Sequence, residues 1–142
     1  MEAADTRSSG RDRLKARYTD YICCLNERRW SDLGAYVDAH AVHNGRPFGL
    51  NGYRAMLEEN VAQIPDLTFN VTRLLIDEEQ ASVAAIIHFE CTPTADIFET
   101  RIDGRKIRFE ENVFYRFSTE ELKIVEVKSI IDIAAIREQA QA

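Results

Sequence analysis

The stretch between Ile107 and Phe117 alternates between two rows of side chains. Counted in steps of two, the mainly apolar row is Ile107, Phe109, Glu111, Val113, Tyr115 and Phe117, and the mainly polar row is Arg108, Glu110, Asn112, Phe114 and Arg116. Alternation of this kind predicts a half-buried β-strand. It places the Glu111 carboxylate within the apolar row, where it must be paired, hydrogen-bonded or protonated, because a bare buried charge costs several kcal/mol.

Two interpretations of Glu111 follow from this position. In the first, the carboxylate borders a cavity, desolvation raises its pKa, and it acts as a general base or acid. In the second, it is ion-paired with an arginine or lysine inside the core. Glu110 replaces Glu111 in either role if the strand register slips by one residue, because a single slip exchanges the two faces.

The rest of the pattern predicts one α+β domain, in which helices come first and strands follow. In chain order, the predicted helices are 14–25, 30–37 and 51–64, the strands are 67–71, 81–91, 105–117 and 122–131, and a short helix follows Asp132. Segregated helices and strands favour a curved antiparallel sheet, or cone, with three N-terminal helices packed on its concave face. Such a fold commonly leaves a cavity between the helices and the sheet.

Length and charge narrow the class of protein. A chain of 142 residues is long enough for one hydrophobic core. We expect a flexible N-terminal leader over residues 1–11, which are small, polar and charged, and a single domain over residues 12–142. The net charge of −6 and the lack of a basic cluster argue against a nucleic-acid partner.

The sequence also lacks the motifs that would indicate a disulfide-rich, metal-binding, membrane or nucleotide-binding protein. Its three cysteines, two of them adjacent, form neither a disulfide framework nor a metal-ligand spacing. No apolar run is long enough to span a membrane, and no signal peptide is visible. There is also no glycine-rich phosphate loop. The sequence therefore predicts a cytoplasmic protein that uses no cofactor and no metal and has no membrane partner.

Eight short segments, in their order and spacing, carry a family resemblance. They span the chain from about Arg13 onward and are Tyr36-Val-Asp38, Val42-His-Asn-Gly45, Ile64-Pro-Asp-Leu-Thr-Phe69, Gly104-Arg-Lys106, Phe109-Glu-Glu111, Phe114-Tyr-Arg-Phe117, Lys123-Ile-Val-Glu126 and Ile131-Asp132. Together they resemble the SnoaL-like polyketide cyclases, or ester cyclases, of the nuclear transport factor 2 superfamily. The resemblance implies a cone fold and acid/base chemistry by a carboxylate, without a cofactor, on polyketides or related secondary metabolites.

The chain departs from that family on its last strand. Characterised cyclases of this type carry a histidine and an aspartate there, two residues apart, and the resemblance places Val127 and Ser129 at these positions. The same aldol cyclisation is therefore not implied, although related members perform isomerisation or ester rearrangement. Ser129 has no evident histidine partner, so we expect it to line the cavity wall rather than to act as a nucleophile.

Two histidines are further candidates. His88 is a candidate catalytic proton shuttle if a bend near Pro93 turns it toward the cavity. If the neighbouring apolar row faces the helices instead, His88 lies on the opposite face, at a structural or dimer-surface position. His43 and Asn44 precede the loop before the third helix, where either residue could orient a substrate carbonyl. Asn44 with Gly45 could equally form only a turn.

The third predicted helix contributes Asn60 and Tyr53 to the substrate-binding candidates. Asn60 lies within the apolar stripe of that helix, so it is either a polar cavity side chain or a buried amide satisfied by backbone groups. The hydroxyl groups of Tyr53, Tyr18, Tyr21 and Tyr115 could donate to an oxyanion. Tyrosines at helical or strand spacing also pack simply as core.

Two functions remain open from the sequence. The first is a cofactor-independent acid/base enzyme, an isomerase, a cyclase or an ester-rearranging enzyme, in which Glu111 moves a proton on a polyketide- or terpenoid-like secondary metabolite. The second is a non-catalytic small-molecule-binding or dimerisation module of the same fold. A homodimer through the outer face of the sheet is compatible with both.

Overall fold

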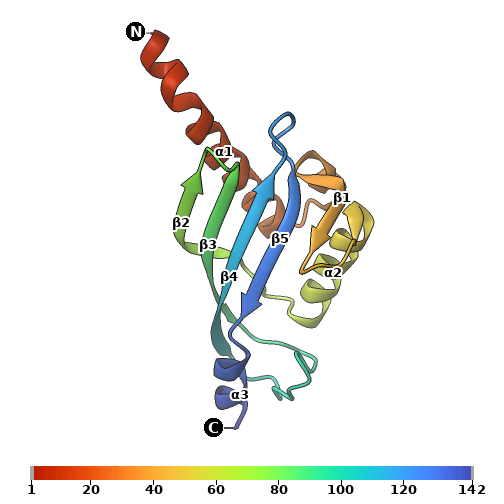
Figure 1. Cartoon of the computed structure of the whole chain (residues 1–142). Helices are drawn as coiled ribbons and strands as arrows, with labels where there is room; N and C mark the ends of the chain where they lie inside the picture. Colours follow the sequence, from red (N-terminus) through yellow and green to blue (C-terminus); the bar gives the residue numbers. More distant parts are fainter. Residues whose placement is uncertain (1, 142) are drawn as a thin grey trace.

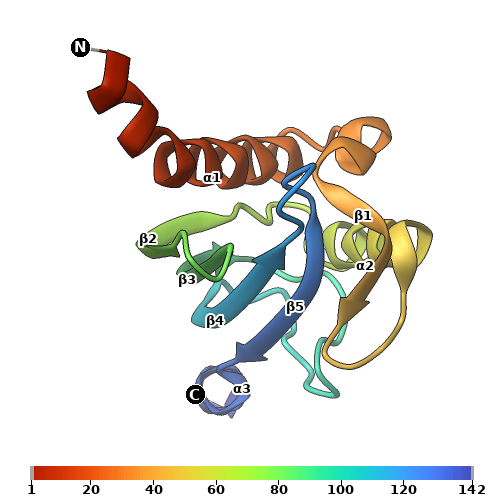
Figure 2. The same cartoon turned by 45° about the horizontal axis from the view of Figure 1, so that its top comes forward.

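The computed structural model describes the backbone of residues 2–141 and the side chains of residues 10–141. Helix α1 (Glu2–Asn26), the 3-10 helix η1 (Trp30–Ala35) and α2 (Gly49–Gln63) precede most of the strands, and α3 (Ile133–Gln141) ends the described chain. Figures 1 and 2 show α1 crossing over one face of a curved sheet, with α3 at the end of the sheet. The α+β architecture predicted from the sequence is confirmed.

Five strands form one sheet in the order β1-β5-β4-β3-β2. Their bounds are β1 Val37–His43, β2 Asn70–Asp77, β3 Ser82–Cys91, β4 Ile107–Phe117 and β5 Ile124–Ile131. Neighbouring strands are antiparallel except at one edge, where β1 runs parallel to β5. The sequence indicated only the antiparallel part, because pairing between strands so far apart in the chain leaves no local signal.

The core lies between the inward face of the sheet and the helices. The alternation predicted for β4 is confirmed: Phe109, Val113 and Tyr115 are buried, whereas Glu110 and Phe114 are exposed. The α1 stripe that packs against this face is equally buried and consists of Leu14, Tyr18, Tyr21 and Leu25. Each such side chain contributes about 1.5–3 kcal/mol when it is fully removed from water.

Several element boundaries differ from the sequence-based prediction, and three of them have a local cause in the structure. Val37 opens β1 instead of ending a second helix, because it pairs with Ile124 in the sheet. Helix α2 begins at Gly49, so Asn51 lies inside the helix and does not cap it. The strand expected over 67–71 begins only at Asn70, because the side chain of Asn26 accepts from the Phe69 N–H at 2.7 Å and donates to the Phe69 C=O at 3.0 Å.

The ends of the chain bear on the domain prediction. Helix α1 begins at Glu2, although its apolar stripe starts only at Leu14. Residues 1–11 include side chains outside the described part, and the flexibility expected for them stays a prediction. At the other end, Asp132 caps α3 as expected, since its carboxylate accepts from the Ala135 N–H at 3.1 Å.

Candidate functional site

A cavity of about 380 Å³ lies between the helices and the inward face of the sheet. Most of its lining is apolar, and the lining comes from the three helices α1, α2 and α3, from β1, β3, β4 and β5, and from the segments that join them. Six of the seven site residues predicted from the sequence line it, namely Glu111, Ser129, His43, Asn44, Asn60 and Tyr53. The fold therefore gathers side chains from β4, β5, α2 and the end of β1 around one space.

Glu111 projects from β4 into this cavity, and the residue is half-buried. Burial raises the pKa of its carboxyl group, and a hydrogen bond donated by the Ser129 hydroxyl to Oε2 partly offsets that effect. Among the side chains of residues 10–141, no cation contributes to this pKa. The structure thus matches the cavity interpretation of Glu111, not the ion-paired one. Glu110 lies on the outer face, so the strand register did not slip.

Ser129 is held in place by Asn44. The Ser129 backbone N–H donates to Asn44 Oδ1 at 2.8 Å, and Asn44 Nδ2 donates to the Ser129 C=O at 3.2 Å. The Asn44 backbone N–H also donates to the Val127 C=O at 2.9 Å. Because both ends of the Asn44 amide are occupied, this residue positions Ser129, which in turn holds the Glu111 carboxylate. The parallel pairing of β1 with β5 makes this bridge possible.

His43 lines the cavity between two aromatic rings. Its imidazole stacks on Phe48 with ring centroids 5.9 Å apart and meets the edge of Tyr53 at 5.8 Å. Burial lowers the pKa of His43, so at neutral pH the ring is an uncharged donor and acceptor. This state suits hydrogen bonding to a substrate oxygen better than it suits charge pairing.

His88 does not reach the cavity. It follows the polar row of β3, pairs with Glu110 across the sheet and is absent from the cavity lining. The apolar residues Ile87 and Phe89 on either side of it face inward and are buried. The geometry therefore gives the predicted catalytic role of His88 no support, because no bend near Pro93 turns the strand over.

Three other cavity residues differ in how far the sequence marked them. Tyr21 and Tyr115, for which the sequence left open either an oxyanion-donor role or a core role, line the cavity and are also almost fully buried. Phe98 also lines the cavity from the loop between β3 and β4, and no periodicity in the sequence marks it.

Phe98 stands on a strained two-residue turn. Ile97 and Thr100 exchange backbone hydrogen bonds of 3.1 and 2.8 Å, and both central residues, Phe98 and Glu99, have positive φ, +48° and +58°. Turns of this kind normally carry Asn-Gly, because side chains with a Cβ are disfavoured at positive φ. The turn keeps a 40% exposed phenylalanine at the cavity.

Replacing Glu99 with glycine is expected to stabilise the folded protein by about 0.5–1 kcal/mol, because glycine adopts positive φ without steric cost. Chemical denaturation would measure the change. Glu120→Gly is the matched control, since Glu120 lies in an exposed turn without positive φ and should lose stability. A loss of stability in Glu99→Gly would contradict the interpretation of strain.

A curved sheet covered by helices, with a cavity between the layers, is the architecture of the nuclear transport factor 2-like class of α+β cones. Within this class, the profile of the SnoaL-like polyketide cyclases matches residues 15–140. The chain belongs to the SnoaL-like polyketide cyclase family.

Solved structures agree with this assignment. A SnoaL-like polyketide cyclase from Agrobacterium tumefaciens str. C58 is 41% identical, with a TM-score of 0.84 over 89% of this chain and 96% of that one. IdmH from Streptomyces antibioticus, a candidate polyketide cyclase, is 17% identical, with a TM-score of 0.77 over 91% and 99% of the two chains. AclR from Streptomyces galilaeus, a candidate hydroxylase, is 16% identical, with a TM-score of 0.75 over 92% and 97%. The last two show the fold alone.

No curated protein matches the chain. Across residues 2–141, none of the helices is both long and apolar enough to cross a membrane.

Proposed function

We propose that the chain is a cofactor-independent acid/base enzyme that acts on a polyketide- or terpenoid-like secondary metabolite held in the cavity. The observation that carries this proposal is the Glu111 carboxylate, which lies in an apolar cavity with a raised pKa and no cationic partner. A desolvated carboxylate is a stronger base than one in water and remains available to return the proton. Isomerisation, cyclisation and ester rearrangement all require such a transfer.

The family membership and the apolar lining support the class of substrate. The lining is dominated by aromatic and aliphatic side chains, with Glu111, Ser129 and Asn60 among its few polar residues. Such a surface suits a bulky, mostly apolar molecule that carries carbonyl or hydroxyl groups. The family resemblance places Val127 and Ser129 at the positions that carry histidine and aspartate in characterised relatives, so proton transfer falls to Glu111.

The first test asks whether Glu111 is a base. 2-Tetralone is a suitable probe, because it is a bicyclic apolar ketone with exchangeable protons next to its carbonyl. In D₂O, wild-type protein is expected to accelerate loss of the C1 proton signal in NMR spectra. With Glu111→Gln, the signal is expected to be lost only at the rate measured in buffer without protein. Glu110→Gln is the matched control, because it makes the same change one residue away on the outer face. Equal rates for wild type and Glu111→Gln would overturn the proposal.

The pKa of Glu111 gives a test that needs no substrate. Carbon NMR titration of wild type, assigned by comparison with Glu111→Gln, is expected to show a carboxyl group that titrates above the usual ~4.3. A value at or below that reference would mean a solvated or ion-paired carboxylate. In that case a small-molecule-binding or dimerisation module without catalysis would be the better description.

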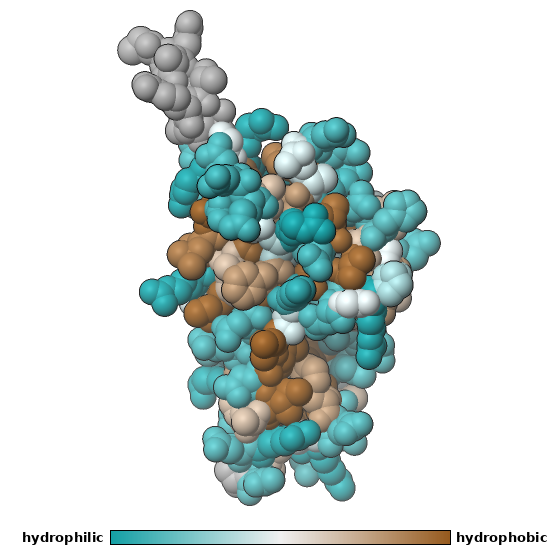
Figure 3. All heavy atoms as spheres, in the orientation of Figure 1, coloured by the Kyte–Doolittle hydropathy of each residue, from teal (hydrophilic) through white to brown (hydrophobic). Residues whose placement is uncertain are grey.

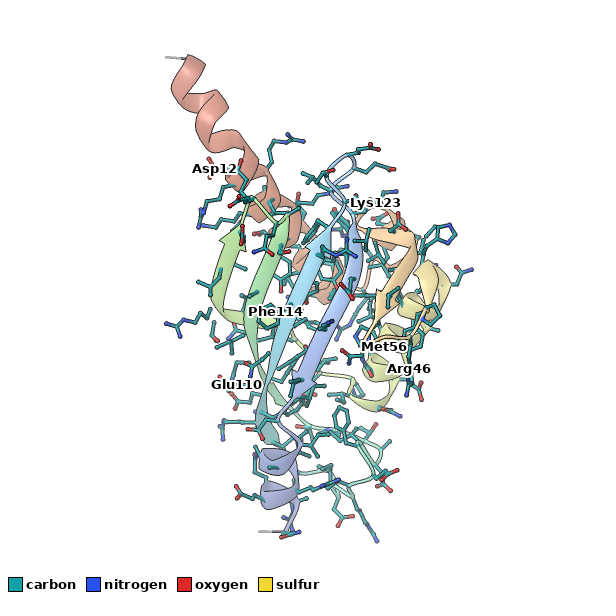
Figure 4. The ribbon with its side chains drawn as sticks, viewed as in Figure 1. Asp12, Arg46, Met56, Glu110, Phe114 and Lys123 are labelled. Atoms are coloured by element: carbon teal, nitrogen blue, oxygen red, sulfur yellow. The ribbon has the colours of Figure 1, made fainter. Side chains whose placement is uncertain are left out.

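We also propose a homodimer through the outer face of the sheet. Three large apolar side chains are exposed there: Leu75 (63%), Phe114 (64%) and Ile130 (74%). Figure 3 shows apolar residues gathered on this face, and Figure 4 places Phe114 on it. Ion pairs on the same face, such as Arg116 with Glu126 at 3.4 Å, provide polar groups beside these apolar side chains. A second copy of the chain offers a face of the same composition.

Phe114→Asp is expected to convert this dimer to a monomer, because it places a charge at the centre of the apolar patch. Sedimentation velocity over a range of concentrations would measure the change. Ala62→Asp, on the exposed side of α2, is the control that adds the same charge away from the sheet. A wild type that sediments as a monomer at every concentration would contradict the proposed dimer.

A further inference from the structure

Two tyrosine hydroxyl groups meet in the helical layer that packs on the sheet. Tyr21 comes from α1 and Tyr53 from α2, and both line the cavity. Their hydroxyl oxygens are 2.6 Å apart. Glu111 and Ser129, by contrast, come from β4 and β5. A molecule in the cavity is therefore flanked by a carboxylate on the sheet side and a phenol pair on the helix side.

One of the two hydroxyl protons of this tyrosine pair has no acceptor within the pair. Two hydroxyl groups carry two protons, and the bond between them uses one. In the described part of the chain, neither Tyr21 nor Tyr53 has a second hydrogen-bond partner for its hydroxyl. Both residues are only 2% exposed. A buried O–H without an acceptor costs about 1–3 kcal/mol, so the remaining proton favours a ligand oxygen in the cavity.

Packing holds the two phenols in position. Tyr21 contacts the rings of Tyr18 and Tyr115, with centroids 6.0 and 5.8 Å away. Tyr53 is held by the edge-on contact with His43. The Glu111 charge helps to raise the pKa of both Tyr21 and Tyr53, which indicates that the carboxylate lies within electrostatic reach of both. Donors fixed in this way need no reorganisation when charge develops on a substrate oxygen.

We propose that the Tyr21–Tyr53 pair donates its free proton in a hydrogen bond to a substrate carbonyl oxygen while Glu111 removes a proton from the adjacent carbon. The C–H electron pair forms a new carbon–carbon double bond, and the carbonyl π pair moves to the oxygen, which becomes an enolate held by the phenols. Protonated Glu111 then returns the proton to carbon. The inference rests on the proposed function and names its substrate class, enolisable ketones and esters.

The binding test uses 2-naphthol, the aromatic counterpart of the 2-tetralone enol, in the Glu111→Gln background. The neutral glutamine stands in for protonated Glu111, so the result does not depend on catalysis. Titration followed by fluorescence gives both the affinity and the ionised fraction of bound naphthol. Tyr21→Phe and Tyr53→Phe each leave one hydroxyl proton available, so each single change is expected to weaken binding only a few-fold. The double variant is expected to weaken it more than tenfold and to suppress the ionised form.

Tyr18→Phe is the matched control. It removes a hydroxyl from the same ring cluster, but Tyr18 is absent from the cavity lining and donates to Tyr115. Circular dichroism melts of every variant check that the fold is kept. A double variant that binds 2-naphthol as its parent does, or a Tyr18→Phe loss of equal size, would overturn the inference.

Exchange of 2-tetralone in the Glu111-containing protein separates this inference from the proposed function. If Glu111→Gln abolishes exchange and the double tyrosine variant keeps the full rate, the donor assignment is wrong and the base assignment stands. If the double variant loses the tight, ionised binding of 2-naphthol while Glu111→Gln exchanges at the wild-type rate, the donor assignment stands and the proposed function fails.

Discussion

Glu111→Gln is expected to slow 2-tetralone exchange at least about 100-fold while making the folded protein more stable at neutral pH. The loss of rate follows from the usual contribution of a positioned general base, about 10²–10⁴-fold. The gain in stability follows because wild type holds a desolvated charge without a cationic partner, whereas glutamine is neutral and of similar shape. The Ser129 hydroxyl can still donate to the amide oxygen of glutamine.

The pH dependence of this stability difference has a definite sign. Burial raises the pKa of Glu111 above its unfolded value, so between the two values the folded state binds more protons than the unfolded state. The stability of wild type therefore falls as pH rises through that window. Each unit of pKa difference corresponds to about 1.4 kcal/mol. Glu111→Gln lacks this titration, so the two proteins differ most above the folded pKa and converge below the unfolded one.

Denaturant unfolding at about pH 8 and about pH 3, on either side of the usual carboxyl range, would measure the convergence. Glu110→Gln serves again as the control, because it makes the same change at an exposed position on the outer face. Lower stability of Glu111→Gln at the higher pH would contradict the desolvated state of Glu111. It would point instead to favourable contacts of the carboxylate that the amide cannot replace.

Ile124→Ala is expected to destabilise the protein by about 2–5 kcal/mol, the usual cost of truncating a fully buried isoleucine. Ile124 has no exposed surface and opens β5. It pairs with Val37 at the parallel edge of the sheet, and its N–H donates to the Tyr36 C=O at 2.7 Å. The cavity left by the change would loosen the attachment of β1, which carries His43 and leads into Asn44.

Ile130→Ala is the matched control for this prediction. It makes the same change on the same strand, but Ile130 is 74% exposed on the outer face. At concentrations where the protein is monomeric, it should shift the free energy of unfolding by no more than about 0.5 kcal/mol. Equal losses for Ile124→Ala and Ile130→Ala would show that β5 is not anchored by its inward side chain.

The sequence alone predicted that the Glu111 side chain points toward the core. Alternation along β4 is a local property of extended backbone, and one apolar row on a half-buried strand must face the core. The same argument located the α1 stripe and the Asp132 cap, because spacing and capping depend on neighbouring residues. Helices followed by strands, together with the family resemblance, were enough to predict the α+β cone.

Tertiary structure decided how the site is assembled. Tyr21 meets Tyr53 across 32 residues, and Asn44 reaches Ser129 across 85. Which row of β3 faces inward depends on which face of the sheet the helices cover. That choice also keeps His88 out of the cavity. Sequence periodicity reports on which side of its own element a residue lies. Which other residues that residue contacts depends on strand order, register and helix packing, which arise only when the whole chain folds.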